Sequence, residues 1–186
     1  MAQNTQGANE LPYAIYEYAT NKQFLNFFEA IGIEKLKVEL VNYDPQRRQH
    51  TDRAVCYLPV TKAKLIIHDI LGNRVRDGWA KEIFGGSERD GQIESRVFKI
   101  EFDPQGEKFA RFPFRITIKI GPGKSTATGG IQPDGQPTTN ISIRLPADDI
   151  LGIMLEIRDY LLVHQRDLEA VRYQDQVKKF NRRQGN

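Results

Sequence analysis

The sequence predicts an α+β domain in which antiparallel sheets are followed by a long C-terminal helix. Three observations support this fold class. Runs in which apolar and polar residues alternate occur in both halves of the chain, and alternation is the pattern of a half-buried strand. From about Pro146 the apolar residues instead recur with the period of a helix. Two segments also share one order of elements: strand, polar loop, strand, Leu-Pro and helix.

The first half is expected to contain strands and helices in mixed order. Residues 1–10 are small and polar and are expected to be disordered, and the aromatic, alternating segment 11–20 predicts a strand. Residues 21–32 predict a short helix with three apolar side chains on one face: Phe24, Phe28 and Ile31. Strict alternation over 35–43 predicts a half-buried strand.

The rest of this half is expected to lead through a helix to an irregular connection. The expected elements are a polar loop over 44–53, a returning strand over 54–59 and a helix over 61–71 that ends at Gly72. A connector over 77–92 follows, with one helical turn around Trp79 and Ile83. Gly72 is expected to end the helix because glycine is favoured just beyond a helix C-terminus.

The second half repeats the strand pattern and then becomes helical. Strands are predicted over 96–102, 112–120 and 140–146. The central one is expected to bury every second side chain: Phe112, Phe114, Ile116, Ile118 and Ile120. A long helix is predicted from about Pro146, with Asp148 and Asp149 in its first turn, where the helix dipole favours negative charge.

The length of 186 residues suits one domain of ordinary size. We expect an α+β domain over 11–171, with candidate halves 11–75 and 92–171, and a basic tail over 172–186. Leu58-Pro59 and Leu145-Pro146 occupy the same place in the two similar segments. An internal duplication would explain this correspondence, but Leu-Pro is common enough at strand ends for coincidence to explain it as well.

Several function classes lack the residues that they require. Cys56 is the only cysteine, which excludes an internal disulfide and a cysteine metal cluster. The three histidines lack metal-ligand spacing, and no serine or cysteine lies in a nucleophile motif. The sequence therefore predicts neither enzyme activity nor a cofactor. The N-terminus lacks the pattern of a signal peptide, and no apolar run approaches the roughly 20 residues of a membrane span, so a cytoplasmic or other intracellular location is expected.

The stretch Lys119–Thr126, KIGPGKST, is similar to the end of a phosphate-binding loop but lacks its first glycine. Ile118 stands where that glycine belongs, and the following residues, rich in glycine and proline, cannot open a helix. We expect instead a long connection from Gly121 to Thr139. It is interpreted either as a solvated surface loop or as a flexible flap, carrying Lys124, that orders over an extended ligand.

Basic side chains recur on the polar faces of several predicted strands: Lys35, Lys37, Lys99, Arg115, Lys119 and Arg144. If these strands lie side by side, the side chains form a cationic surface suited to a phosphate backbone, interrupted only by Glu39 and Glu101. Thr117 lies on the same face, Lys124 follows it, and Tyr43 and Tyr57 are aromatic residues that could stack on bases. The alternative is that these lysines only protect strand edges from unwanted pairing.

The organisation of the chain resembles the Whirly family and the related positive-cofactor-four-like domains. The similar parts are the strands RVFKIEF, FPFRITIKI and NISIRLP leading into the helix from Pro146, together with an earlier copy that ends in LPVTKAKLIIHDIL, over roughly residues 35–165. The resemblance implies antiparallel sheets followed by a helix, binding of single-stranded nucleic acid, and a homo-oligomer. The Lys-Gly-Lys-Ala-Ala-Leu motif of plant Whirly proteins is absent, and the first half is expected to have fewer strands and an extra helix.

These observations favour a non-catalytic protein that binds single-stranded DNA or RNA, with DNA favoured and with little sequence specificity. The predicted contacts are the cationic sheet face and the loop after Gly121, and no membrane partner is expected. A different class remains open: a scaffolding or assembly protein that acts through oligomerisation and protein contacts. An enzyme acting on nucleic acid would need clustered carboxylates for a metal, and the predicted strands do not assemble such a cluster.

Overall fold

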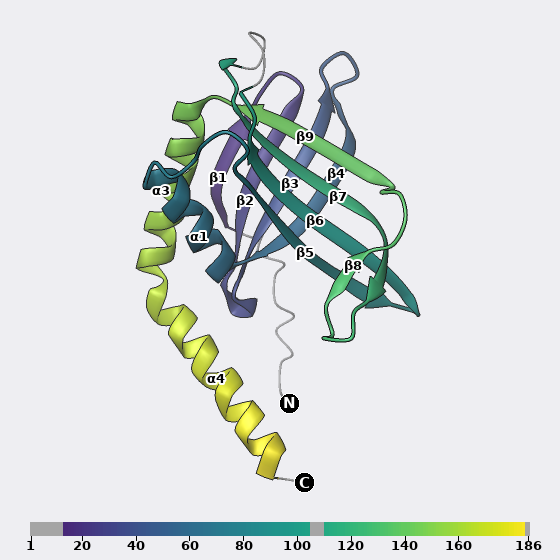
Figure 1. Ribbon diagram of the computed structural model, residues 1–186, viewed down its shortest axis with the longest axis vertical. Coiled ribbons are helices and arrows are strands. Elements are labelled where there is room, and N and C mark those ends of the chain that lie inside the picture. Colours follow the sequence, from purple (N-terminus) through teal and green to yellow (C-terminus); the bar gives the residue numbers. More distant parts are fainter. Residues whose placement is uncertain (1–12, 105–109, 185–186) are drawn as a thin grey trace, which may run out of the picture.

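The structure is a computed structural model that describes residues 13–104 and 110–184. The expected disorder of residues 1–10 and the last two residues of the tail lie outside this description. Two antiparallel sheets form the body of the molecule. Figure 1 shows their strands crossing, with α1 and α3 along one side and α4 extending away from both sheets.

The first sheet is a meander whose strands neighbour each other in chain order. Its strands are β1 (Ala14–Ala19), β2 (Gln23–Ala30), β3 (Lys35–Asp44) and β4 (Gln49–Pro59). A single 3-10 turn, η1 (Ile31–Ile33), joins β2 to β3, and the helix α1 (Val60–Leu71) follows β4 directly. The strand predicted over 35–43 and the helix predicted over 61–71 are therefore confirmed.

The second sheet repeats this plan with one added hairpin. Its strands are β5 (Ala80–Arg89), β6 (Gln92–Phe102), β7 (Phe114–Ser125) and β9 (Thr139–Leu145), with β8 (Ile131–Pro133) paired to the end of β7. The helix α3 (Ala147–Val163) follows β9, and α4 (Gln165–Gln184) begins after His164. The expected boundary at residues 171–172 falls within α4.

Each half thus contains four antiparallel strands followed by a helix, with the short strand β8 added in the second half, which confirms the α+β class and the repeated order of elements. Pro59 and Pro146 occupy the N-cap positions of α1 and α3, where a residue without a backbone N–H removes no helical hydrogen bond. The expectation that the first half has too few strands and an extra helix is wrong.

The missing strand is β2, at the place where the sequence pattern predicted a helix. Phe24 and Phe28 are four residues apart, a spacing that puts two side chains on one face in a helix and in a strand alike. Leu25 and Phe27 lie between them and are buried on the opposite face. Pairing with β1 on one side and β3 on the other forms a ladder that outweighs any local helix preference.

The predicted connector over 77–92 is also wrong, because most of it forms β5. This strand pairs with β6 over its whole length. Its alternation is weak because Gly85 and Gly86 occupy its centre, so the sequence pattern did not indicate a strand.

The core lies between the inner faces of the two sheets and the apolar sides of α1 and α3. Its largest fully buried side chains include Phe27, Leu36 and Leu40 from the first sheet, Ile100, Ile116, Ile118 and Ile143 from the second, and Ile150, Ile153 and Ile157 from α3. Phe112 departs from the expected pattern, because it precedes β7 and is exposed. None of the described helices is long and apolar enough to cross a membrane.

Candidate nucleic-acid interface

The nine side chains predicted to contact nucleic acid lie on two sheets rather than one. Lys35, Lys37 and Tyr57 are on the outer face of the first sheet, since their strands direct the alternate residues into the core. The outer face of the second sheet carries Lys99, Arg115, Thr117, Lys119 and Arg144, and Lys124 lies where β7 pairs with β8. The two sheets pack through their apolar faces, so these residues form two surfaces.

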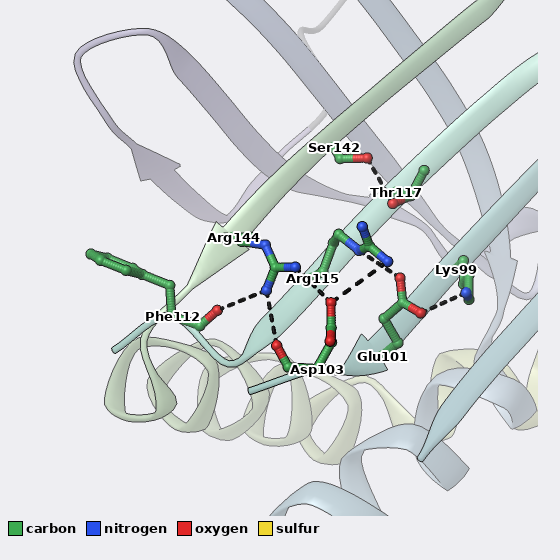
Figure 2. A network of polar contacts seen from close by, with 8 residues as sticks. All are labelled: Lys99, Glu101, Asp103, Phe112, Arg115, Thr117, Ser142 and Arg144. Atoms are coloured by element: carbon green, nitrogen blue, oxygen red, sulfur yellow. Dashed lines mark hydrogen bonds and ion pairs between the residues drawn. The ribbon is translucent and has the colours of Figure 1, made fainter. Parts of the chain in front are cut away.

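On the second sheet, a network of ion pairs holds three of the predicted cations (Figure 2). The Glu101 carboxylate lies 2.5 Å from Lys99 Nζ and accepts a hydrogen bond of 2.6 Å from Arg115 Nε. Asp103 pairs with Arg144 at 2.6 Å and with Arg115 at 3.8 Å. Because each cation is shared with a carboxylate, this part of the sheet presents much less positive charge than its lysine and arginine residues indicate.

The protonation of Glu101 reflects this network. Burial opposes ionisation of its carboxyl group, but the hydrogen bonds from Lys99 and Arg115 outweigh burial and hold the pKa of Glu101 below its usual range. Glu101 is therefore charged at neutral pH and neutralises part of the cationic charge beside it.

Two other predicted residues of this face have structural contacts. Thr117 is buried, and its hydroxyl is 2.8 Å from that of Ser142 on β9. Arg144 donates hydrogen bonds to the backbone carbonyls of Asp103 and Phe112, which ties β9 to the ends of β6 and β7. Thr117 has too little exposed surface to contact a ligand directly.

Lys119 has a different environment from the other cations of the second sheet. It makes no ion pair among the described residues. Val97 on β6 pairs with Lys119 on one side and with the exposed Phe84 of β5 on the other, so Lys119 and Phe84 lie in one row across the strands. Both side chains line a hollow of about 170 Å³, together with Val97, Pro133 and Pro137. An apolar ring and an unshared ammonium group therefore lie at one place on this face.

The connection from Gly121 to Thr139 is largely a hairpin rather than an irregular loop. Strand β7 continues to Ser125, and Lys124 pairs with Asp134 at 3.1 Å. A Cβ atom on Gly121 would lie 2.8 Å from the Cα atom of Pro137, closer than real Cβ contacts allow. This glycine therefore permits a close approach of two backbones, whereas the sequence pattern indicated only flexibility.

The outer face of the first sheet combines aromatic rings with cations. Phe24 and Tyr43 meet edge to face at 5.6 Å, and His50 lies 6.0 Å from each ring. Lys37 Nζ lies 4.6 Å above the ring of Phe28. Tyr57, in the same row as Phe28 and Lys37, is 40% exposed. Rings of this kind on a sheet surface can stack on unpaired bases.

The charges on this face are less completely paired than those on the second sheet. The buried Glu39 pairs with Arg53 at 2.5 Å and with Lys37 at 3.7 Å. Lys35 has no ion pair among the described residues. The β3–β4 turn contains the exposed Arg47, which pairs with Asp44 at 3.6 Å, and the exposed Arg48, which makes no ion pair within the described part of the chain. We call this surface, together with the turn at its end, the aromatic–cationic face: Phe24, Phe28, Lys35, Lys37, Tyr43, Arg47, Arg48, His50, Arg53 and Tyr57.

Several residues of these surfaces were missed by the sequence pattern, among them Arg47, Arg48 and His50, which had been placed in the polar loop over 44–53. Phe24 and Phe28 had been assigned to a helix, Arg53 to a loop and Phe84 to a connector. The period-two alternation of Leu25 and Phe27 was a usable signal for β2. No group of three or more His, Cys, Asp or Glu side chains able to hold a metal occurs within residues 13–104 and 110–184.

Comparisons with known proteins bear on the fold. No protein-family model matches the chain, and no curated protein sequence matches it. Among solved structures, WHY1 from Arabidopsis thaliana matches with a TM-score of 0.51 and 12% identity, over 83% of this chain and 91% of that chain. Two others are a plant transcriptional regulator, PBF-2 (TM-score 0.49, 13% identity, 88% and 89% coverage), and Arabidopsis WHY3 (TM-score 0.47, 12% identity, 92% and 97% coverage). The fold of this chain is therefore Whirly-like.

Proposed function

We propose that this chain binds single-stranded nucleic acid without catalysis, with DNA favoured over RNA and with little sequence specificity. The observation that carries the proposal is the aromatic–cationic face of the first sheet, where Tyr57, Phe28 and the Phe24–Tyr43–His50 cluster lie among basic side chains. Exposed rings stack on bases of any sequence, and nearby cations contact phosphates. The Whirly-like fold agrees with this proposal, because the Whirly family, which the sequence resembles, binds single strands.

The predicted residues take different parts in this proposal. On the first sheet, Tyr57 stacks on bases, while Lys35 and Lys37 contact phosphates. On the second sheet, Lys119 with Phe84 extends the binding surface, and Lys124 contacts the strand from the β7–β8 hairpin. Lys99, Arg115 and Arg144 are held by Glu101 and Asp103 and contribute only their residual charge. The buried and uncharged Thr117 has a structural part through its contact with Ser142.

The test is fluorescence anisotropy with labelled single-stranded DNA, duplex DNA and single-stranded RNA, each titrated at two salt concentrations. The proposal expects single strands to bind more tightly than duplex and the affinity to fall as salt rises. Failure of all three nucleic acids to bind at low salt would refute it.

Two kinds of variant separate charge from stacking on the aromatic–cationic face. Lys35→Glu with Arg48→Glu should weaken binding and flatten its salt dependence, because phosphate contacts release counterions. Lys62→Glu with Arg74→Glu is the matched control, since it makes the same charge change on α1 and on the turn that follows. Tyr57→Ala should weaken binding by about 1–3 kcal/mol with little change in salt dependence. Equal effects of the test and control pairs would show that this face is not the binding surface.

A scaffolding or assembly protein is the second candidate function. The observation that favours it is a set of exposed apolar side chains on the helices, including Leu65, Leu162 and Phe180. A protein of this class would self-associate without nucleic acid and would show no salt-dependent binding of single strands in the same titrations.

A further inference from the structure

The β7–β8 hairpin folds over the outer face of the second sheet. Strand β8 pairs with the end of β7 and also lies against β5 and β6, at one end of the sheet (Figure 1). A Cβ atom on Gly86 of β5 would lie 2.8 Å from Cγ2 of Ile131 on β8, which leaves no room for a side chain there. The hairpin therefore packs directly on the rows that contain Gly86 and Gly121.

This packing leaves a hollow of about 170 Å³ between the hairpin and the neighbouring rows of the sheet. We call it the hairpin hollow, and the residues that the argument uses are Glu82, Phe84 and Lys119 from the sheet and Pro133 and Pro137 from the hairpin. The ring of Phe84 is 52% exposed. Pockets for drug-sized molecules have volumes of about 300–1,000 Å³, so this smaller hollow suits one flat ring that packs against Phe84.

Two opposite charges line the hairpin hollow without meeting. Glu82 and Lys119 make neither an ion pair nor a side-chain hydrogen bond within residues 13–104 and 110–184. Lys119 is half-buried, and a partly desolvated charge gains from a hydrogen-bonding partner. A ligand that donates hydrogen bonds to the Glu82 carboxylate and accepts one from the Lys119 ammonium group would satisfy both side chains.

Guanine is the nucleobase that fits these two charges best. Its Watson–Crick edge carries two adjacent donors, N1–H and the 2-amino group, and the acceptor O6 beside them. A carboxylate can accept both donors at once, one on each oxygen, in charge-assisted hydrogen bonds. Adenine and cytosine offer only one amino donor on this edge, and thymine offers one ring N–H. The edge is free in single strands and paired in a duplex.

We propose that the hairpin hollow binds one guanine base. Glu82 accepts hydrogen bonds from N1–H and the 2-amino group, and Lys119 donates to O6. The ring lies between Phe84 on the sheet and the prolines of the hairpin. For a guanine within a strand, the inference rests on the proposed binding of single strands, to which it adds one base-specific contact. A free guanine mononucleotide presents the same base.

The first test compares three labelled strands by fluorescence anisotropy at one salt concentration: oligothymidine, the same strand with one central guanine, and the same strand with inosine in that place. Inosine has N1–H and O6 but lacks the 2-amino group. The guanine strand should bind about tenfold more tightly than oligothymidine, since a bidentate pair discriminates between bases by about that factor. The inosine strand should lie between them. Equal affinity of the three strands would overturn the proposal.

Two variants of exposed glutamates on β5 identify the carboxylate. Glu82→Gln should remove most of the preference for guanine over thymine, because a neutral amide has one acceptor oxygen and turns its own N–H groups toward the donors of the base. Glu88→Gln is the matched control, since Glu88 lies on the same strand and face but outside the hollow. A guanine preference that survives in Glu82→Gln, or that falls equally in Glu88→Gln, would show that the hollow is not the site.

The second test uses free mononucleotides, followed by saturation-transfer NMR. Guanosine monophosphate should receive saturation from the unmodified chain, thymidine monophosphate should not, and Glu82→Gln should abolish the signal. A guanine preference in strands without this signal would restrict the site to bases within a strand. Binding of guanosine monophosphate by a chain that binds no strand would keep the hollow and refute the proposed function. If strands bind without guanine preference and guanosine monophosphate does not bind, the hollow is refuted while the proposed function stands.

Discussion

Replacing Glu101 by glutamine should measure how much the ion network on the second sheet stabilises the fold. The Glu101 side chain is 13% exposed, whereas Lys99 and Arg115 are 31% and 38% exposed. A hydrogen bond to a charged group contributes about 1.5–3 kcal/mol when buried, and an exposed ion pair contributes about 0–1 kcal/mol. Because the partners of Glu101 are partly exposed, Glu101→Gln should lower the free energy of unfolding by an amount between these limits, about 1–2 kcal/mol. For a chain of this size, the thermal midpoint should fall by about 2–8 °C.

The dependence on pH identifies the charge as the cause. Because hydrogen bonds hold the folded-state pKa of Glu101 below its unfolded value, the stability that it contributes is present above the unfolded pKa and is lost as pH falls through the folded pKa. The difference in free energy of unfolding between wild type and Glu101→Gln should therefore be largest at neutral pH and should shrink below about pH 4.

Urea unfolding, followed by the fluorescence of the only tryptophan, Trp79, provides the assay at both pH values. Glu82→Gln is the matched control, because Glu82 is exposed in the same row as Lys99 and makes no ion pair within the described part of the chain. If Glu101→Gln were as stable as wild type at neutral pH, or if it lost as much stability at acidic pH as at neutral pH, the reasoning would be refuted.

Three further predictions concern nucleic-acid binding by the Glu101→Gln variant, the reactivity of Cys56 and the backbone packing at Gly121. Glu101→Gln should also release Lys99 and Arg115 for phosphates, so anisotropy should show tighter single-strand binding with a salt slope steeper by about 0.7 per added contact; unchanged binding would exclude this part of the second sheet from the interface. Burial raises the pKa of the Cys56 thiol to about 12, so a thiol reagent at pH 8 should label Cys56 only after denaturation, and rapid labelling of the folded chain would contradict its burial. Gly121→Ala should destabilise the fold by about 1–3 kcal/mol in urea because its Cβ would overlap the backbone of Pro137, whereas Gly32→Ala, with open space around it, should not.

The elements that the sequence predicted correctly are those with unbroken patterns. Strands β3, β6, β7 and β9 alternate clearly, and α1 and α3 have wide apolar faces. Strand β2 was missed because Phe24 and Phe28 fit both periods, and β5 because its glycines interrupt the alternation. Only pairing with neighbouring strands, which is a long-range property, decides such segments.

The candidate site shows the same limit. Alternation placed Lys99, Glu101 and Arg115 on outward faces, but which cation meets which carboxylate depends on strand register. Glu101 lies directly opposite Arg115 because β6 and β7 pair in one particular register, and a shift of one residue would separate them. The sequence therefore indicated the composition of each surface without showing how its charges are paired.

That pairing explains how the second sheet keeps two arginines side by side. Arg115 lies directly opposite Arg144 in the β7–β9 pair, and like charges opposite each other destabilise a sheet. Glu101 and Asp103 offset this repulsion by binding the two guanidinium groups. On the first sheet, Glu39 does the same for Lys37 and Arg53. In both sheets a partly or fully buried carboxylate thus allows cations to gather on the outer face, so the charge available to a phosphate backbone is the surplus over these carboxylates. Aromatic side chains accompany that surplus mainly on the first sheet, which is why we propose the binding surface there.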